Sequence, residues 1–120
     1  MARRDLTGAV EFAYLEAYAG GDQQVVDEVL ALFREQASMW ARLLDPASGD
    51  GAWRDAVHTL KGSARGIGAN PLADACAAAE TGSDAGGAKA LNAVRDALDQ
   101  ALADIAAYAH EQALRSLKSP

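Results

Sequence analysis

The stretch WRDAVHTLKGSARGIG, residues 53–68, raises the question on which the interpretation of this chain depends. Apolar residues recur in it at steps of three and four, the spacing that places side chains on one face of a helix. Three glycines, at positions 62, 66 and 68, interrupt the pattern. Such glycines either wrap the phosphates of a nucleotide or clear space around a reactive side chain, here His58. The apolar positions are Trp53, Ala56, Val57, Leu60, Ala64 and Ile67.

A nucleotide-binding turn is one alternative, because GSARGIG at 62–68 resembles the cofactor fingerprint of short-chain dehydrogenases. That turn must follow a buried strand, whereas the residues before it here, WRDAVHTL, have helical spacing. Neither Tyr14 nor Tyr108 has a lysine four residues on, and no Gly-Lys-Ser/Thr sequence occurs. A chain of 120 residues is also too short for a full doubly wound sheet. We therefore do not expect a dehydrogenase.

Helical spacing continues on both sides of this stretch. A short helix is predicted at about 10–19, and the GGD sequence at 20–22 ends it, with Asp22 as N-cap of the next helix. That long helix should end near Asp45-Pro46, before a loop at 46–51, and Gln36 lies inside its apolar stripe. We predict that its buried face carries Val25, Val29, Leu32, Phe33, Trp40 and Leu43.

Two further helices complete the pattern. Asn70-Pro71 is typical of an N-cap followed by proline at the first helical position, and Gly82 should end this shorter helix. A last long helix is marked by Leu91, Val94, Leu98, Leu102, Ile105 and Tyr108. The sequence therefore predicts an all-α protein, an antiparallel four-helix bundle with a short additional N-terminal helix, forming one domain over residues 1–120.

Composition excludes several classes of function. Hydrophobic residues make up 50% of the sequence, but only 6% is aromatic. The formal net charge of −6 argues against a nucleic-acid binder, because such proteins hold phosphate groups with clustered lysine and arginine. The basic start MARR is followed by DLTG, so it is no secretory signal, and we expect a cytoplasmic protein without a membrane span. The single cysteine, Cys76, permits neither an internal disulfide nor a cysteine-cluster metal site, and we interpret it as a buried thiol.

The outward side of the helix at 53–68 is chemically unusual. At 100° per residue, Arg54, His58, Lys61, Gly62 and Arg65 share this side, so a histidine lies among three cations in an acidic protein. Glycine inside a helix lowers its stability, and Gly62 lies one turn from His58, where a missing side chain opens access to the ring.

Phosphoryl transfer through the imidazole fits these residues. A neutral histidine has a free nitrogen lone pair near physiological pH and attacks a phosphoryl group without a strong base. Lys61 is placed to pair with the phosphoryl oxygens, and Arg54 and Arg65 would extend a positive rim. We expect such a site to need no metal of its own.

The stretch AVHTLKGSARGIGA, residues 56–69, resembles the phosphorylation motif of histidine-containing phosphotransfer (HPt) domains. The segments LALFREQA before it and LADACAAAE after it, with the five-helix pattern, also resemble this family, so the likeness covers most of the chain. The residues at the motif's spacing are His58, Lys61, Gly62, Ser63 and Gly68.

The resemblance implies a monomeric relay protein without turnover of its own. His58 would accept a phosphoryl group from the aspartate of one receiver domain, in a response regulator or hybrid histidine kinase, and pass it to another. Lys61 would assist by its charge and Gly62 by leaving room, while Gln36 would hydrogen-bond and orient the histidine. Mg²⁺ is expected only in the partner's receiver domain. A helical adaptor that docks signalling proteins without chemistry is the alternative function.

Overall fold

The computed structural model of the chain describes residues 6–45, 51–82, 85 and 87–118, and within these ranges all regular structure is helical. This confirms the predicted all-α class. Within the same ranges no helix is both long and apolar enough to cross a membrane. The helices are α1 (Phe12–Tyr18), α2 (Gln23–Arg42), α3 (Ala52–Ile67), α4 (Asn70–Thr81) and α5 (Ala88–Lys118).

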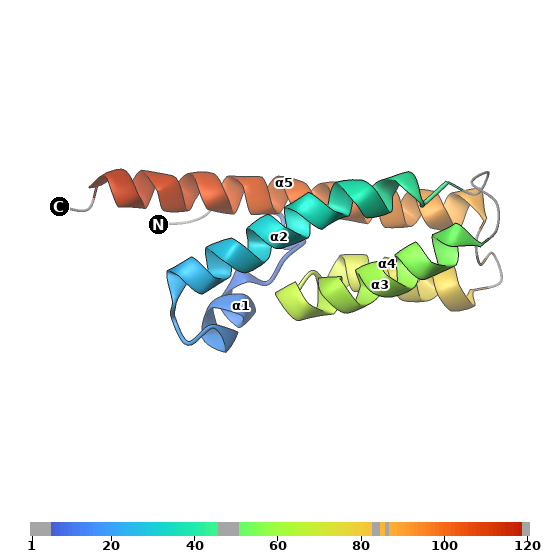
Figure 1. Cartoon of the computed structure of the whole chain (residues 1–120), viewed down its shortest axis with the longest axis horizontal. Helices are drawn as coiled ribbons and strands as arrows, with labels where there is room; N and C mark the ends of the chain where they lie inside the picture. The colour runs from blue at the N-terminus through green and yellow to red at the C-terminus, as the bar shows by residue number, and fades with distance from the viewer. Residues whose placement is uncertain (1–5, 46–50, 83–84, 86, 119–120) are drawn as a thin grey trace.

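Helices α2 to α5 form an antiparallel four-helix bundle, as predicted (Figure 1). Helix α3 packs against α2 and α4, and both α2 and α4 pack against α5. The short helix α1 lies at the end of the bundle where α2 begins, and contacts α2 and α3. The molecule is elongated, 54 × 22 × 21 Å, because α5 runs along its whole length.

The buried face of α2 differs from the predicted one. Phe33 and Trp40 are buried as expected, but Val25, Leu32 and Leu43 are exposed. The reason is that α2 carries two apolar stripes, one residue apart in sequence and therefore about 100° apart around the helix. Periodicity fits both stripes, and packing against the other helices selects one of them. The buried side chains of α2 are Val26, Leu30, Phe33, Ala37 and Trp40.

The predicted helix boundaries hold with small shifts. The carboxylate of Asp22 caps α2 by accepting hydrogen bonds from the backbone N–H groups of Gln24 and Val25. Helix α2 ends at Arg42, earlier than expected, and Gly82 follows α4. Helix α4 begins at Asn70 itself, so Ala69, and not Asn70, is the N-cap residue. Residues 46–50 of the predicted loop lie outside the described ranges.

A buried carboxylate attaches the segment that precedes α1 to the bundle. The side chain of Asp104 on α5 has no exposed surface. Its Oδ1 accepts hydrogen bonds from the backbone N–H and the hydroxyl of Thr7, both at 3.0 Å, and its Oδ2 accepts one from the N–H of Ala9 at 3.0 Å. These donors compensate for the burial of the carboxylate.

The turn between α3 and α4 gives a second attachment. Gly68 has φ +81°, in the left-handed region that favours glycine, and its carbonyl accepts a hydrogen bond from the N–H of Glu11 at 2.9 Å. A Cβ at position 68 would lie 3.1 Å from the backbone oxygen of Glu11. Glycine is therefore required here both by the turn and by the close approach of the α1 segment.

Candidate functional site

Helix α3 presents His58 to solvent. Its buried side chains include Val57, Leu60 and Ala64, which fixes the rotation of the helix and turns residue 58 outward. The imidazole side chain is 73% exposed. Nothing in the described part of the chain covers the ring, so a second protein has access to it.

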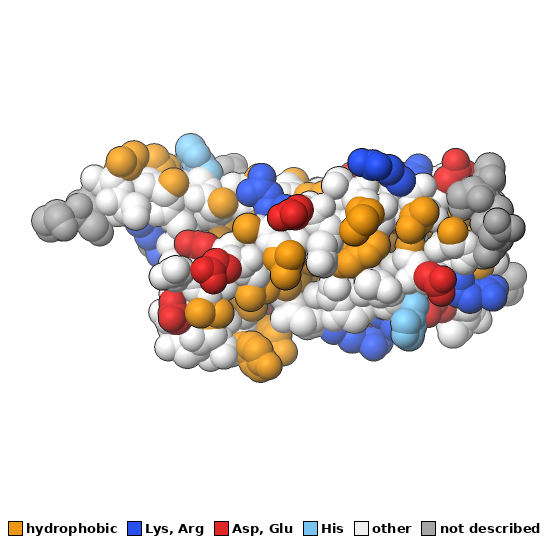
Figure 2. Space-filling model, in the orientation of Figure 1, with side chains coloured by type: hydrophobic (Ala, Val, Ile, Leu, Met, Phe, Trp, Pro, Cys, Tyr) orange, Lys and Arg blue, Asp and Glu red, His pale blue; other side chains and the backbone are white. Residues whose placement is uncertain are grey.

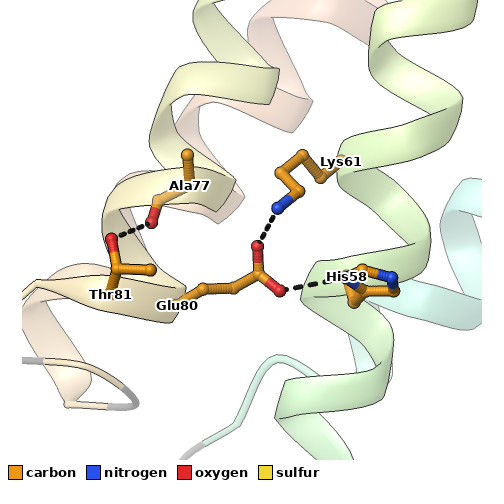
Figure 3. A network of polar contacts seen from close by, with 5 residues as sticks. All are labelled: His58, Lys61, Ala77, Glu80 and Thr81. Carbon is orange, nitrogen blue, oxygen red and sulfur yellow. Dashed lines mark hydrogen bonds and ion pairs between the residues drawn. The ribbon is translucent and has the colours of Figure 1, made fainter.

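The ring is held by a residue that the sequence analysis did not single out, Glu80 in the last turn of α4. Figure 3 shows the Glu80 carboxylate between the side chains of His58 and Lys61. Nδ1 of His58 lies 3.1 Å from Oε2 of Glu80, and Nζ of Lys61 donates a hydrogen bond to Oε1. One carboxylate therefore connects the two residues of α3 that the sequence had predicted to act together.

This arrangement determines which ring nitrogen is free. The Lys61 ammonium, with a smaller contribution from His58, holds the pKa of Glu80 below its ordinary value of 4.5, so the carboxyl group is ionised near neutral pH. An ionised carboxylate only accepts hydrogen bonds, so Nδ1 of His58 must carry the proton and donate it. In the neutral ring, the lone pair then lies on Nε2.

Lys61 lies deeper than His58. Its side chain is 20% exposed, and that of Glu80 is 16% exposed, so the ion pair is partly shielded from water. The ammonium group lies on the α4 side of the histidine and is already neutralised by Glu80 (Figure 3). Contact with an incoming phosphoryl group requires Lys61 to turn away from this carboxylate or to be shared with it.

Gly62 lies on the outer surface of α3 beside His58. A Cβ built at this position meets no heavy atom within 4 Å, and the residue has ordinary helical backbone. The fold itself therefore does not require glycine here. A side chain would extend into the solvent next to the imidazole.

The two arginines of the predicted rim are exposed on α3 and make no hydrogen bond to His58 among the described residues. The guanidinium of Arg54 lies 4.9 Å from the ring centroid of Trp53, a cation–π contact. Arg65 lines a shallow depression with Glu11, Tyr14, Gly68 and Asn70.

The structure does not bring Gln36 and His58 together. Gln36 is half-buried on α2, and among the described residues no hydrogen bond joins it to the imidazole. The hydrogen bond to the ring comes from Glu80 on α4, on the other side of α3. The expected orienting role of Gln36 is therefore replaced by Glu80.

Cys76, one turn before Glu80 on α4, takes no part in this network. Its side chain has no exposed surface, and burial, followed by the charge of Glu80, raises the pKa of the thiol from 9.0 to about 12. A thiol with such a pKa is not a nucleophile near neutral pH.

Comparison with known proteins agrees with the geometry. A family model described as Hpt domain matches residues 24–108, so the chain belongs to the Hpt family. The crystal structure of the histidine phosphotransferase ShpA from Caulobacter crescentus is similar, with 63% sequence identity and a TM-score of 0.81. The match covers 92% of this chain and 99% of that one. No curated protein matches the chain.

Proposed function

We propose that this Hpt protein carries phosphoryl groups in a phosphorelay, with His58 as the residue that accepts them from the aspartate of one receiver domain and returns them to another. The observation that supports this most strongly is the exposed imidazole with Nδ1 bonded to Glu80 and Nε2 open to solvent. The ShpA structure, at 63% identity, supports the same phosphotransfer role.

In the transfer step, the Nε2 lone pair attacks the phosphorus of the receiver's aspartyl phosphate. The N–P bond forms as the P–O bond to aspartate breaks, and the aspartate leaves as a carboxylate. The ring gains positive charge, which the Glu80 carboxylate stabilises through the Nδ1 proton. Lys61 balances charge on the phosphoryl oxygens, and Gly62 leaves room for the group. The reverse step delivers the phosphoryl group to the next receiver.

The exposed apolar stripe of α2 is the docking surface of this proposal. Leu32 and Met39 are 54% and 56% exposed, and Val25 and Leu43 are also exposed at helical spacing. Figure 2 shows hydrophobic side chains along the face of the molecule on which α2 lies. An exposed apolar face of this kind is typical of a protein interface.

The finer points of the proposal follow from this chemistry. The protein is a relay intermediate without turnover of its own, and Mg²⁺ belongs to the receiver, whose acidic pocket supplies most of the catalysis. We propose a cytoplasmic monomer whose partners are receiver domains of response regulators and hybrid kinases, not nucleic acid or membranes. Arg54 and Arg65 add positive potential around His58.

The test compares His58→Gln with His110→Gln, a matched change at the exposed histidine of α5. Each protein is incubated with phosphorylated receiver domains, and intact mass is measured under neutral and acidic conditions. We expect an acid-labile phosphoryl group on the wild type and on His110→Gln, and none on His58→Gln. Uptake by His58→Gln would disprove the assignment, and binding without uptake by the wild type would favour the adaptor.

A further inference from the structure

A groove of about 410 Å³ separates α2 from α5. Helices α3 and α5 each pack against both α2 and α4, so the α2–α5 edge of the bundle lies opposite the α3–α4 edge. His58 and its hydrogen-bond partner Glu80 occupy the α3–α4 edge. A molecule bound in the groove would therefore leave the imidazole accessible to a receiver.

The floor of this groove is apolar and its walls are low. Leu30 and Ile105 form part of the lining and are buried, whereas Ala31, Ala109 and Ala113 are exposed and carry only a methyl group. Small side chains along two packed helices leave a channel between them, and such a channel accepts the larger apolar side chains of a third helix. The remaining lining residues are Gln23, Asp27, Arg34, Gln112, Arg115 and Ser116.

Gln112 brings a polar group into this groove that the fold does not satisfy. It follows Ile105 by seven residues and Tyr108 by four, so it continues the core-facing side of α5. Its Nε2 atom is buried, and no acceptor for this donor is found in the described part of the chain. A buried donor costs free energy unless it is hydrogen-bonded. An occupant of the groove that places an oxygen beside Gln112 would remove this cost.

The α2 wall carries one charge of each sign. Asp27 and Arg34 are exposed and lie seven residues, or about two helical turns, apart. Asp27 accepts a hydrogen bond from Gln23 at 2.8 Å, and Arg34 forms no ion pair with any residue of the described ranges. On the α5 wall, Arg115 lies 3.4 Å from Glu111 of the same helix. The groove therefore favours an occupant with one acidic and one basic residue over an occupant of uniform charge.

We propose that the groove between α2 and α5 binds an amphipathic helix of a second protein, whose apolar stripe is flanked by an acidic and a basic residue seven positions apart. The acidic residue pairs with Arg34, the basic residue pairs with Asp27, and a side-chain oxygen between them accepts a hydrogen bond from Gln112. Such a helix holds this protein beside its partner while His58 exchanges phosphoryl groups, which raises the local concentration of both. The binding itself does not depend on the proposed function.

The first test measures the binding of two fluorescent helical peptides of about 15 residues. Both carry leucines three and four positions apart and a central glutamine. One has glutamate and lysine seven positions apart beside the leucines, and the other has lysine at both positions. Fluorescence anisotropy gives their affinities for the wild type, for Arg34→Asp and for the control Arg42→Asp, which makes the same change in charge at an exposed position of α2 outside the groove.

We expect the wild type and Arg42→Asp to bind the glutamate–lysine peptide at least about tenfold more tightly than the lysine–lysine peptide, and Arg34→Asp to reverse this preference. High salt should reduce the difference. No binding of either peptide, equal affinities for the two peptides in the wild type, or the same reversal in Arg42→Asp would overturn the proposal.

The same peptide shows whether the groove is independent of the transfer site. At a saturating concentration of the glutamate–lysine peptide, the rate of transfer from a phosphorylated receiver should stay within about twofold of the rate without peptide, because the two sites lie on opposite edges of the bundle. A large loss of transfer would show that the peptide covers the receiver surface and would overturn the proposal. His58→Gln should bind the peptide like the wild type, so failure of phosphoryl uptake and failure of peptide binding are separate results.

The second test uses Gln112→Leu, with Gln100→Leu as the control at an exposed position of α5 outside the groove. Gln112→Leu replaces a buried donor without a partner by an apolar group of similar size, so we expect a higher melting temperature for the free protein. The same change should weaken binding of the glutamate–lysine peptide by about tenfold, and a peptide with leucine at the central position should restore the affinity. A lower melting temperature, an unchanged affinity, or an equal loss in the control would contradict the role given to Gln112.

Discussion

Two carboxylates, Asp104 and Glu80, show how the same functional group serves two different purposes in this molecule. Asp104 is fully buried and accepts hydrogen bonds from neutral backbone and hydroxyl groups of the N-terminal segment. Glu80 is partly exposed and binds two groups that can carry positive charge, Lys61 and His58. The first arrangement is closed to solvent and fixes the fold. The second stays accessible and can rearrange, which a transfer site requires.

The largest effect is expected from Asp104→Ala. This change leaves the buried N–H of Ala9 and the N–H and hydroxyl of Thr7 without their acceptor, and we expect a loss of about 3 kcal/mol in the free energy of unfolding. Urea denaturation measures it. The rate of phosphoryl transfer by the fraction of the variant that remains folded should be within about twofold of the wild-type rate. If Asp104→Ala instead lost most of its transfer rate without losing stability, Asp104 would have a role in phosphoryl transfer. The contrast between Asp104 and Glu80 would then not hold.

Gly68→Ala should have the next largest effect. The substitution strains a left-handed backbone and brings a Cβ to 3.1 Å from the carbonyl oxygen of Glu11, so we expect a loss of about 2 kcal/mol. The matched control is Gly66→Ala, at a helical position with open space, which should stabilise the protein slightly. Thermal unfolding distinguishes the two, and equal melting temperatures would contradict the role of the turn.

Glu80→Ala should have the opposite effect to Asp104→Ala, with a large loss of transfer rate and a small loss of stability. Loss of the hydrogen bond that orients the imidazole is expected to lower the transfer rate by about tenfold, the equivalent of about 1.4 kcal/mol, with less than about 1 kcal/mol lost in stability. Glu80→Gln keeps a hydrogen-bond acceptor but loses the charge, and should fall between wild type and Glu80→Ala. Single-turnover kinetics with one phosphorylated receiver measure the rates. Wild-type rates in both variants would show that Glu80 is only structural.

The smallest expected effect is the pH dependence of the stability that the ion pair between Lys61 and Glu80 contributes. Because the pKa of Glu80 is lowered in the folded protein, its contribution to stability is present above the ordinary value of 4.5 and is lost as pH falls through the lower folded value. The difference in unfolding free energy between wild type and Glu80→Gln, below about 1 kcal/mol, should therefore disappear in acid. A difference that grows as the pH falls below 4.5 would contradict this sign.

The sequence predicted α3 and its reactive face because all of that information is local. The position of His58 relative to Lys61 and Gly62 depends only on helical spacing within one element. The face of α2 was predicted only in part: Phe33 and Trp40 are buried and Val29 packs against the core, but Val25, Leu32 and Leu43 are exposed. Two stripes fit the same periodicity, and only packing distinguishes them. In this molecule the misassigned stripe is the surface that we propose for docking.

The role of Glu80 was missed because it depends on how two helices align. His58 lies ten residues before Gly68, and Glu80 lies eleven residues after Ala69. An antiparallel pair of helices with its turn at 68–69 therefore brings them to the same level. Counting outward from the turn would have found Glu80, whereas the family-like segment LADACAAAE showed only that a helix followed. Asp104 could not have been assigned in this way, since its partners lie near the opposite end of the chain.

The burial of Cys76 has a practical consequence for experiments on this protein. With a pKa of about 12, only about one thiol in 10⁵ is ionised at pH 7, and the side chain has no exposed surface. The Cys76 thiol therefore reacts very slowly with maleimides and other thiol reagents. A cysteine introduced on the surface of α2 or α3 would react selectively, so a fluorescent or spin label could follow partner association without first removing the native cysteine.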